Sequence, residues 1–261
     1  MAKRRHSWNN SIYERFMREG RGQGIGSGYK PWIYIQDFSS KGTVSRIKGR
    51  KSGRVHHLMS NQELAYFYIL DWSDSVVDIR EQYPLLDISC AKSIASQSGI
   101  KYPLDRVSGF PYILTCDFMI TTIHGLKART VKTSVELNNA RTLEKLEIER
   151  RYWESKGIEW RIVTEKEISV NKSKIIEWLY SAEGFEIDEA SPIAEAASMM
   201  VKMLSTCILS VNEVSQLVEE EFLLSEGTGL LLFKHLALNK LISFDMEVRL
   251  NLNARKVHIQ V

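Results

Sequence analysis

The sequence has few cysteines, no long hydrophobic run and no nucleotide-binding loop, and each absence excludes a class of protein. Its three cysteines, Cys90, Cys116 and Cys207, lie far apart, which excludes a disulfide framework and a Cys-x-x-Cys zinc site. No run of 18 or more apolar residues is present, so no membrane-spanning helix is expected. The glycines of residues 20–28 alternate at a spacing that fits neither the dinucleotide fingerprint nor the P-loop, and we interpret this segment as a flexible loop. Residues 1–6 are basic but lack the apolar stretch of a signal peptide, so we expect a reduced, cytoplasmic protein.

Charge is distributed unevenly along the chain. Residues 1–55 contain 13 Lys or Arg against 3 acids, a net charge of +10, so with +3 overall the remaining residues sum to −7. The aromatic residues interleaved with these cations are Trp8, Tyr13, Phe16, Tyr29, Trp32 and Tyr34. Because Lys and Arg displace condensed counterions from a polyphosphate backbone, this segment is expected to contact nucleic acid. The alternative is a solvated, partly disordered terminus.

Hydrophobic periodicity predicts an α/β fold for residues 1–168, with a mixed sheet flanked by helices. The predicted helices cover residues 60–72 and 139–156. The predicted strands cover residues 31–38, 76–79, 111–123, 126–135 and 158–164. A turn at His124-Gly125 makes the third and fourth of these strands a hairpin.

After residue 168 the hydrophobic pattern changes from mixed strands and helices to successive helices, so residues 169–261 are predicted to form a second domain. The predicted helices there cover residues 171–181, 190–207, 210–224 and 228–239. Two alternating segments, 241–246 and 256–261, follow as a terminal β-hairpin. Helices followed by a hairpin indicate a winged-helix-like domain, which serves either DNA binding or protein docking.

Three residues could together carry phosphodiester hydrolysis. Asp117 lies within the first hairpin strand and Lys132 within the second, so the turn is expected to bring them opposite each other to within about a residue. Glu63 lies in the first turn of the preceding helix. Carboxylates can hold Mg²⁺ beside a scissile phosphate, and a nearby lysine can stabilise the transition state.

Each residue also has a purely structural interpretation. Glu63 could act only as the capping-box partner of Ser60. Asp117 could face solvent from its strand, and Lys132 could be a charge that protects a sheet edge. A further acid, Glu149, lies near the apolar face of its helix and could approach the site, but an ion pair with Arg150 or Arg151 of a neighbouring element is the expected role.

The chain resembles the TnsA endonuclease family over nearly its whole length, and the resemblance thins beyond about residue 180. The stretches that carry it are Glu19–Gly24, Gly53–Leu58, Val77–Gln82, Arg141–Glu147 and Glu149–Trp153. The resemblance implies a restriction-endonuclease-like core in which Glu63, Asp117 and Lys132 occupy the family's catalytic positions. Two positions before the lysine the family has glutamine where this chain has Thr130, so the backbone carbonyl of Val131 is expected to contribute more to metal binding.

The resemblance also implies an activity and its partners. It implies Mg²⁺-dependent cleavage of the 5′ strand at transposon ends in cut-and-paste transposition, with Mn²⁺ as a substitute. The implied partners are double-stranded DNA, a DDE-type transposase subunit, TnsB, and an AAA+ ATPase regulator, TnsC. Two other functions remain open from the residues alone: a stand-alone nuclease of the restriction or junction-resolving kind, and a non-enzymatic winged-helix DNA-binding regulator.

Overall fold

The computed structural model describes residues 7–37, 43–206 and 208–254. It separates into two compact units, Met1–Ile168 and Ser169–Val261. Within the described residues, no helix combines the length and the apolar character needed to cross a bilayer.

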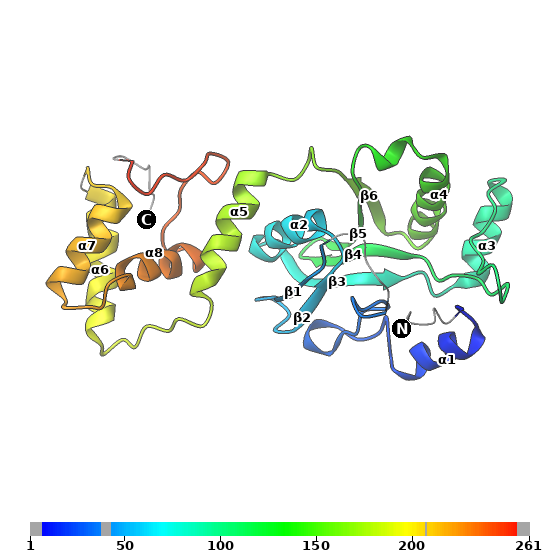
Figure 1. Ribbon diagram of the computed structural model, residues 1–261, viewed down its shortest axis with the longest axis horizontal. Coiled ribbons are helices and arrows are strands. Elements are labelled where there is room, and N and C mark those ends of the chain that lie inside the picture. The colour runs from blue at the N-terminus through cyan, green and yellow to red at the C-terminus, as the bar shows by residue number, and fades with distance from the viewer. Residues whose placement is uncertain (1–6, 38–42, 207, 255–261) are drawn as a thin grey trace, which may run out of the picture. The chain divides into compact units, whose positions relative to one another are not determined.

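The first unit is built on a four-stranded mixed sheet with helices packed against it (Figure 1). Its helical segments are α1 (Asn10–Arg18), η1 (Gly26–Gly28), α2 (Asn61–Trp72), α3 (Ile88–Gln97), η2 (Glu136–Asn138) and α4 (Ala140–Ser155). Its strands are β1 (Ser45–Lys48), β2 (Val55–Leu58), β3 (Val76–Pro84), β4 (Thr115–Thr122), β5 (Gly125–Val131) and β6 (Glu159–Val163).

The sheet has the order β3-β4-β5-β6. Strand β4 pairs antiparallel with both β3 and β5, whereas β6 pairs parallel with β5. Helix α4 forms the crossover that a parallel pair requires. Strands β1 and β2 form a separate antiparallel pair. The predicted α/β fold with a mixed sheet is therefore confirmed.

The register of the β4–β5 hairpin differs slightly from the prediction. Phe118 pairs with Arg129, and continuing the ladder by one residue sets Thr130 opposite Asp117. Lys132 thus lies two residues beyond the opposite position, rather than within one. Because side chains alternate along a strand, residues 130 and 132 still project to the same side.

Helices α3 and α4 cover the sheet with a common hydrophobic core. Small residues of α3 and large residues of α4 pack on side chains of β4 and β5, and the buried members are Leu85, Ala91, Ala95, Tyr102, Cys116, Met119, Ala128, Ile148, Tyr152 and Trp153. This layer buries one face of the β4–β5 hairpin away from its exposed turn, and it holds the Asp117 end of the hairpin in place.

Residues 7–37 pack into the first unit, so this described part of the basic segment is not a solvated terminus, whereas residues 1–6 lie outside the described residues. Phe16 and Trp32 are buried, and Trp8 makes an edge-to-face contact with each of them. Of the predicted strand over residues 31–38, the described residues 31–37 form turns that bury Trp32, and no strand. Phe16 and Trp32 are therefore core residues that are not available to stack on bases, whereas Trp8 is partly buried against them.

The alternating glycines of residues 20–28 form tight turns that pack against the sheet, which corrects the interpretation as a flexible loop. Gly22 has a φ of +73°, and a Cβ there would lie 2.3 Å from Pro84. The amide of Gly26 donates to Asp78 of β3. Glycine at position 22 is thus required both by the backbone conformation and by the close approach to β3.

The second unit consists, in its described residues, of helices. These are α5 (Val170–Leu179), η3 (Tyr180–Ala182), α6 (Pro192–Thr206), α7 (Val211–Glu221) and α8 (Thr228–Leu238). A Cβ on Gly229 would lie 2.4 Å from the Ser215 carbonyl oxygen, so glycine allows α8 to approach α7 closely. Within residues 208–254, the predicted strand over residues 241–246 does not form. Its expected partner, residues 256–261, lies outside the described residues.

Candidate active site

Asp117 and Lys132 meet at the end of the β4–β5 hairpin. The Lys132 Nζ lies 3.2 Å from Asp117 Oδ2 and also donates to the Val131 carbonyl at 2.7 Å. The Val131 amide donates to the same Asp117 oxygen at 2.7 Å. Asp117 is only 8% exposed, so its strand position is not solvent-facing. The two residues that the sequence placed on paired strands are therefore in direct contact.

Glu63 approaches this pair from the first turn of α2. Its carboxylate is 5% exposed and accepts hydrogen bonds from the Met59 amide and the Ser60 hydroxyl, both at 3.0 Å. Ser60 caps α2 by accepting from the Glu63 amide. Burial, followed by repulsion from Asp117, raises the pKa of Glu63 to about 8. Glu63 thus helps to order the start of α2 and also lies beside Asp117.

Lys132 is a cation in this setting. Burial acts to lower the pKa of its amine, but the Asp117 carboxylate raises that pKa above the usual range for lysine. The charges of Glu149 and Glu63 act in the same direction. One fixed positive charge therefore lies among several carboxyl groups.

For Glu149, the sequence favoured the wrong one of two interpretations. The expected ion pair with a neighbouring arginine is wrong: Arg150 pairs with Glu147 and Glu154, and Arg151 pairs with Glu147. Glu149 is instead fully enclosed, and burial raises its pKa to about 8. A signal was present in the sequence, since Glu149 lies on the apolar face of its helix, but it did not identify the partners.

Two donors hold the Glu149 carboxyl group in place. The Trp160 indole N–H donates to it at 2.8 Å, and the Thr130 hydroxyl donates to the same oxygen. Because Thr130 uses its hydroxyl in this way, its side chain is directed to Glu149. The position two residues before the lysine therefore connects the hairpin to α4 through a hydrogen bond.

The donor set suits a divalent cation of the Mg²⁺ type. Both hydrogen bonds to Asp117 fall on Oδ2, and its Oδ1 accepts none from any described residue. Glu63 and Asp117 repel each other, which a shared cation would relieve. Across the described part of the chain, no group of three His, Cys, Asp or Glu side chains is arranged to hold a metal. Mg²⁺ commonly binds through one or two carboxylates and retains water, so two carboxylates and the Val131 carbonyl fit that pattern.

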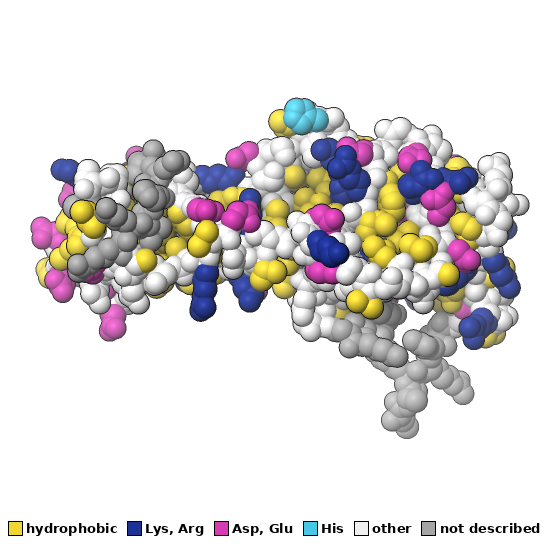
Figure 2. Space-filling model, turned by 90° about the horizontal axis from the view of Figure 1, so that it is seen from above, with side chains coloured by type: hydrophobic (Ala, Val, Ile, Leu, Met, Phe, Trp, Pro, Cys, Tyr) yellow, Lys and Arg dark blue, Asp and Glu magenta, His cyan; other side chains and the backbone are white. Residues whose placement is uncertain are grey.

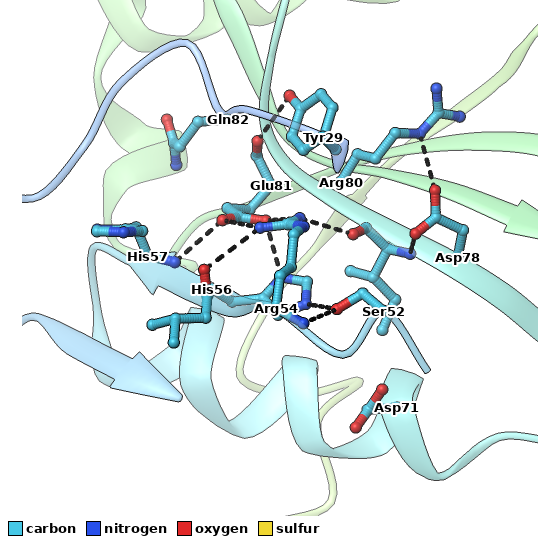
Figure 3. A network of polar contacts seen from close by, with 12 residues as sticks. Tyr29, Ser52, Arg54, His56, His57, Asp71, Asp78, Arg80, Glu81 and Gln82 are labelled. Atoms are coloured by element: carbon cyan, nitrogen blue, oxygen red, sulfur yellow. Dashed lines mark hydrogen bonds and ion pairs between the residues drawn. The ribbon is translucent and has the colours of Figure 1, made fainter. Parts of the chain in front are cut away.

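A buried ionic cluster lies next to this site on β3 (Figure 3). The Glu81 carboxylate accepts from Arg54 through both oxygens and from His56 Nδ1 at 2.8 Å, while Ser52 lies 2.7 Å from His56 Nε2. Burial acts to raise the pKa of Glu81, but the hydrogen bonds from Arg54 and His56 lower it to about 2. Ser52, His56 and Glu81 are all buried, so this cluster ties the β1–β2 pair to the sheet.

Surface charge on the face drawn in Figure 2 is mixed. Lys and Arg side chains lie beside Asp and Glu side chains there, without a continuous basic face. The excess of cations in residues 1–55 is partly used internally, because Arg21 pairs with Glu19 and Asp37 and Arg54 pairs with Glu81. The count of basic residues therefore overstates the charge that this segment offers to DNA.

Known proteins resemble the chain across both units. Residues 73–165 match the family model described as TnsA-like endonuclease N terminal, and residues 167–246 match that described as TnsA endonuclease C terminal. The chain is 45% identical over 202 residues to the Transposon Tn7 transposition protein TnsA of Escherichia coli, an alignment that covers 74% of this chain and 73% of that protein.

Proposed function

The chain belongs to the TnsA endonuclease family, and we propose that it is a transposon-encoded DNA endonuclease that cuts the 5′, non-transferred strand at transposon ends. The reaction is Mg²⁺-dependent hydrolysis that leaves a 5′-phosphate and a 3′-hydroxyl. The observation that carries this proposal is the contact between Asp117 and Lys132, with Glu63 beside them.

Each of these residues has a defined chemical role in the proposal. Glu63, Asp117 and the Val131 carbonyl would hold Mg²⁺, which supplies Lewis-acid activation of the phosphate and lowers the pKa of a bound water. Mn²⁺ would substitute for it. Lys132, held by Asp117 and Val131, directs its positive charge toward the scissile phosphate and stabilises the transition state. The Thr130–Glu149 contact fixes the hairpin against α4, so that these groups keep their spacing.

Strand assignment and metal dependence can be tested together. The full chain is mixed with a catalytically inactive variant of a DDE-type transposase partner, TnsB, which cannot cut the other strand itself, with its ATPase regulator, TnsC, and with a transposon-end duplex labelled on either strand. With Mg²⁺ we expect nicks on the 5′ strand only, carrying 5′-phosphates. Chelation of the metal should abolish the nicks, and Mn²⁺ should restore them. Cleavage that persists in the chelator, or that occurs on the other strand, would contradict the proposal.

The second unit is proposed to recruit a partner protein, with DNA contact secondary. Residues 169–261 contain 8 Lys or Arg against 13 Asp or Glu, a net charge of −5. This balance opposes a phosphate backbone as its main partner. The ATPase regulator of the transposition system is the partner we assign to it.

A fragment of residues 169–261 is therefore expected to bind the ATPase regulator and to show little affinity for duplex DNA at physiological salt. Binding is measured by titration against each partner at two salt concentrations. The full chain provides the control, because its basic first unit should retain affinity for DNA. Tight, salt-sensitive DNA binding by the fragment without ATPase binding would reverse the assignment.

A further inference from the structure

Gln82 has an unusual backbone conformation within β3. Its φ is +49°, which non-glycine residues rarely adopt. The surrounding contacts hold this conformation, because the Trp32 amide donates to the Gln82 carbonyl at 3.2 Å and the preceding residue, Glu81, is fixed by Arg54 and His56. Strained backbone of this kind persists where neighbouring structure over-determines it, and it is enriched at functional sites.

The strained residue directs a buried amide toward the proposed metal site. Gln82 is 5% exposed, and in Figure 3 its side chain lies apart from the Glu81 cluster. Its Nε2 donates to Glu63 Oε2 at 3.4 Å, and its Oε1 accepts from the Thr115 hydroxyl at 3.3 Å. On the neighbouring strand, Glu81 pairs with Phe118 and Tyr83 pairs with Cys116, so the register sets Gln82 opposite Asp117.

From its place on β3, Gln82 thus connects α2 and β4, the two elements that carry Glu63 and Asp117. Its backbone belongs to β3, its amide N–H contacts the acid of α2, and its amide oxygen contacts β4 two residues before Asp117. The Glu63 carboxylate oxygen is an acceptor and so takes the N–H end of the amide, which leaves the oxygen end to accept from the Thr115 hydroxyl. The other donors to Glu63, Met59 and Ser60, come from the start of α2 itself and cannot relate that helix to β4.

We propose that Gln82 is a positioning residue of the nuclease site, whose side-chain amide holds the Glu63 carboxylate in the orientation that binds the divalent cation beside Asp117. This inference rests on the proposed function, because it assumes that Glu63 and Asp117 share a metal. Gln82 acts through Glu63 and does not itself contact the reacting phosphate. Substitutions of residues that orient metal ligands typically weaken metal binding by roughly 10- to 100-fold. The 3.4 Å contact is long for an N–H···O bond, so an effect of about 10-fold is expected.

The test measures metal binding directly as well as cleavage. Mn²⁺ binding to the full chain without DNA is followed by electron paramagnetic resonance, and cleavage is followed as a function of Mg²⁺ concentration. Gln82→Met keeps the length of the side chain but removes the amide. We expect its Mn²⁺ dissociation constant, and the Mg²⁺ concentration for half-maximal cleavage, to rise about 10-fold. Saturating Mg²⁺ should restore the wild-type rate.

Two further variants separate the amide from the backbone. Gln82→Gly removes the amide while relieving the constraint of positive φ, and it should show the same loss of metal affinity even if Gln82→Met does not fold. Gln97→Met, on the exposed surface of α3, makes the same chemical change away from the site and should bind Mn²⁺ as the wild type does.

The outcomes distinguish this inference from the proposed function. A folded Gln82→Met or Gln82→Gly protein with wild-type Mn²⁺ affinity overturns the positioning role, whatever happens to cleavage. Asp117→Asn is measured alongside them. If Asp117→Asn binds Mn²⁺ as tightly as the wild type, the metal site itself is misassigned and the proposed function fails. If Asp117→Asn loses the metal while both Gln82 variants retain it, only the role of Gln82 is rejected.

Discussion

Asp117→Ala is expected to reduce strand cleavage by about 10³-fold or more while the protein remains folded. Lys132 Nζ and the Val131 amide both bond to Asp117, so this one carboxylate organises the proposed site. A bound metal supplies several kcal/mol of transition-state stabilisation, and about 1.36 kcal/mol corresponds to each tenfold in rate. Removal of the Asp117 carboxylate, the proposed metal ligand that Glu63 and Lys132 both face, should therefore lower the cleavage rate below what a simple rate assay can detect.

The thermal stability of Asp117→Ala should change little. The variant loses the ion pair with Lys132, but it also removes the charge that repels Glu63 and helps to raise the pKa of that acid to about 8. A carboxyl group that keeps its proton in the native state, yet loses it when unfolded, destabilises the fold as pH rises from about 4.5 toward 8. These effects oppose each other, so we expect a melting midpoint within about 4 °C of the wild type.

We expect Lys132→Ala and Thr130→Ala to lose less cleavage rate than Asp117→Ala, in that order. Lys132→Ala should lose about 10²- to 10³-fold in rate, as expected for one electrostatic donor to a transition state. Thr130→Ala should be milder, at most about 10-fold, because it removes one hydrogen bond to Glu149 and leaves the proposed ligands in place. The rates are measured with the transposase partner, and melting is measured on the same samples. If a folded Asp117→Ala or Lys132→Ala protein cuts at a near wild-type rate, the site lies elsewhere. If Thr130→Ala loses as much cleavage rate as Asp117→Ala, the ranking is wrong.

Glu81→Ala is expected to give the largest loss of stability, about 3–5 kcal/mol in the free energy of unfolding. Glu81 is fully buried and is the common acceptor for Arg54 and His56, so its removal leaves a buried guanidinium without its partner. The free energy of unfolding is obtained from urea titrations at pH 7. Glu154→Ala is the matched control: it removes an exposed partner of Arg150, and it should cost less than about 1 kcal/mol.

The cluster of Glu81, Arg54 and His56 also determines how the stability of the fold changes with pH. The pKa of Glu81 is lowered from 4.5 to about 2 in the folded protein, so its contribution is complete above about pH 4.5 and is lost as pH falls through about 2. In Glu81→Ala this part of the acid sensitivity should disappear. A stability loss below about 1 kcal/mol at pH 7 would show that Arg54 finds another partner and that the cluster is dispensable.

The elements with strong periodicity were predicted well from the sequence. Helices α2 and α4 and strands β4, β5 and β6 lie where the pattern placed them, because each carries a regular apolar face or an alternating run. Helix α3 was missed because it packs through the small residues Ala91 and Ala95, which give little hydrophobic contrast. The short strands β1 and β2 were missed because each spans only four residues, and the buried side chains of β2 are one histidine and one leucine, His56 and Leu58, which give too short an apolar alternation.

Only the part of the candidate site that is formed by residues close together in the sequence could be predicted. A hairpin turn relates Asp117 to Lys132 through strand spacing alone, so their contact could be expected, although the register was off by two residues. Glu149 and Gln82 could not be placed in this way. Their roles depend on where α4 crosses the sheet and on a left-handed backbone conformation at one position of β3, and both follow from tertiary packing.

The mixed pairing of the sheet sets an order of assembly during synthesis. The β4–β5 hairpin closes over a few residues, and β3 can join it as soon as both strands exist, because these pairings are antiparallel. The parallel strand β6 can dock only after α4 has been made and folded back, and it brings Trp160 to Glu149. A chain still growing on the ribosome would therefore contain the Asp117–Lys132 pair before Glu149 of α4 makes its contacts with Thr130 and Trp160. Within the first unit, the surroundings of the nuclease centre are therefore completed only once β6, which ends at Val163, has been made.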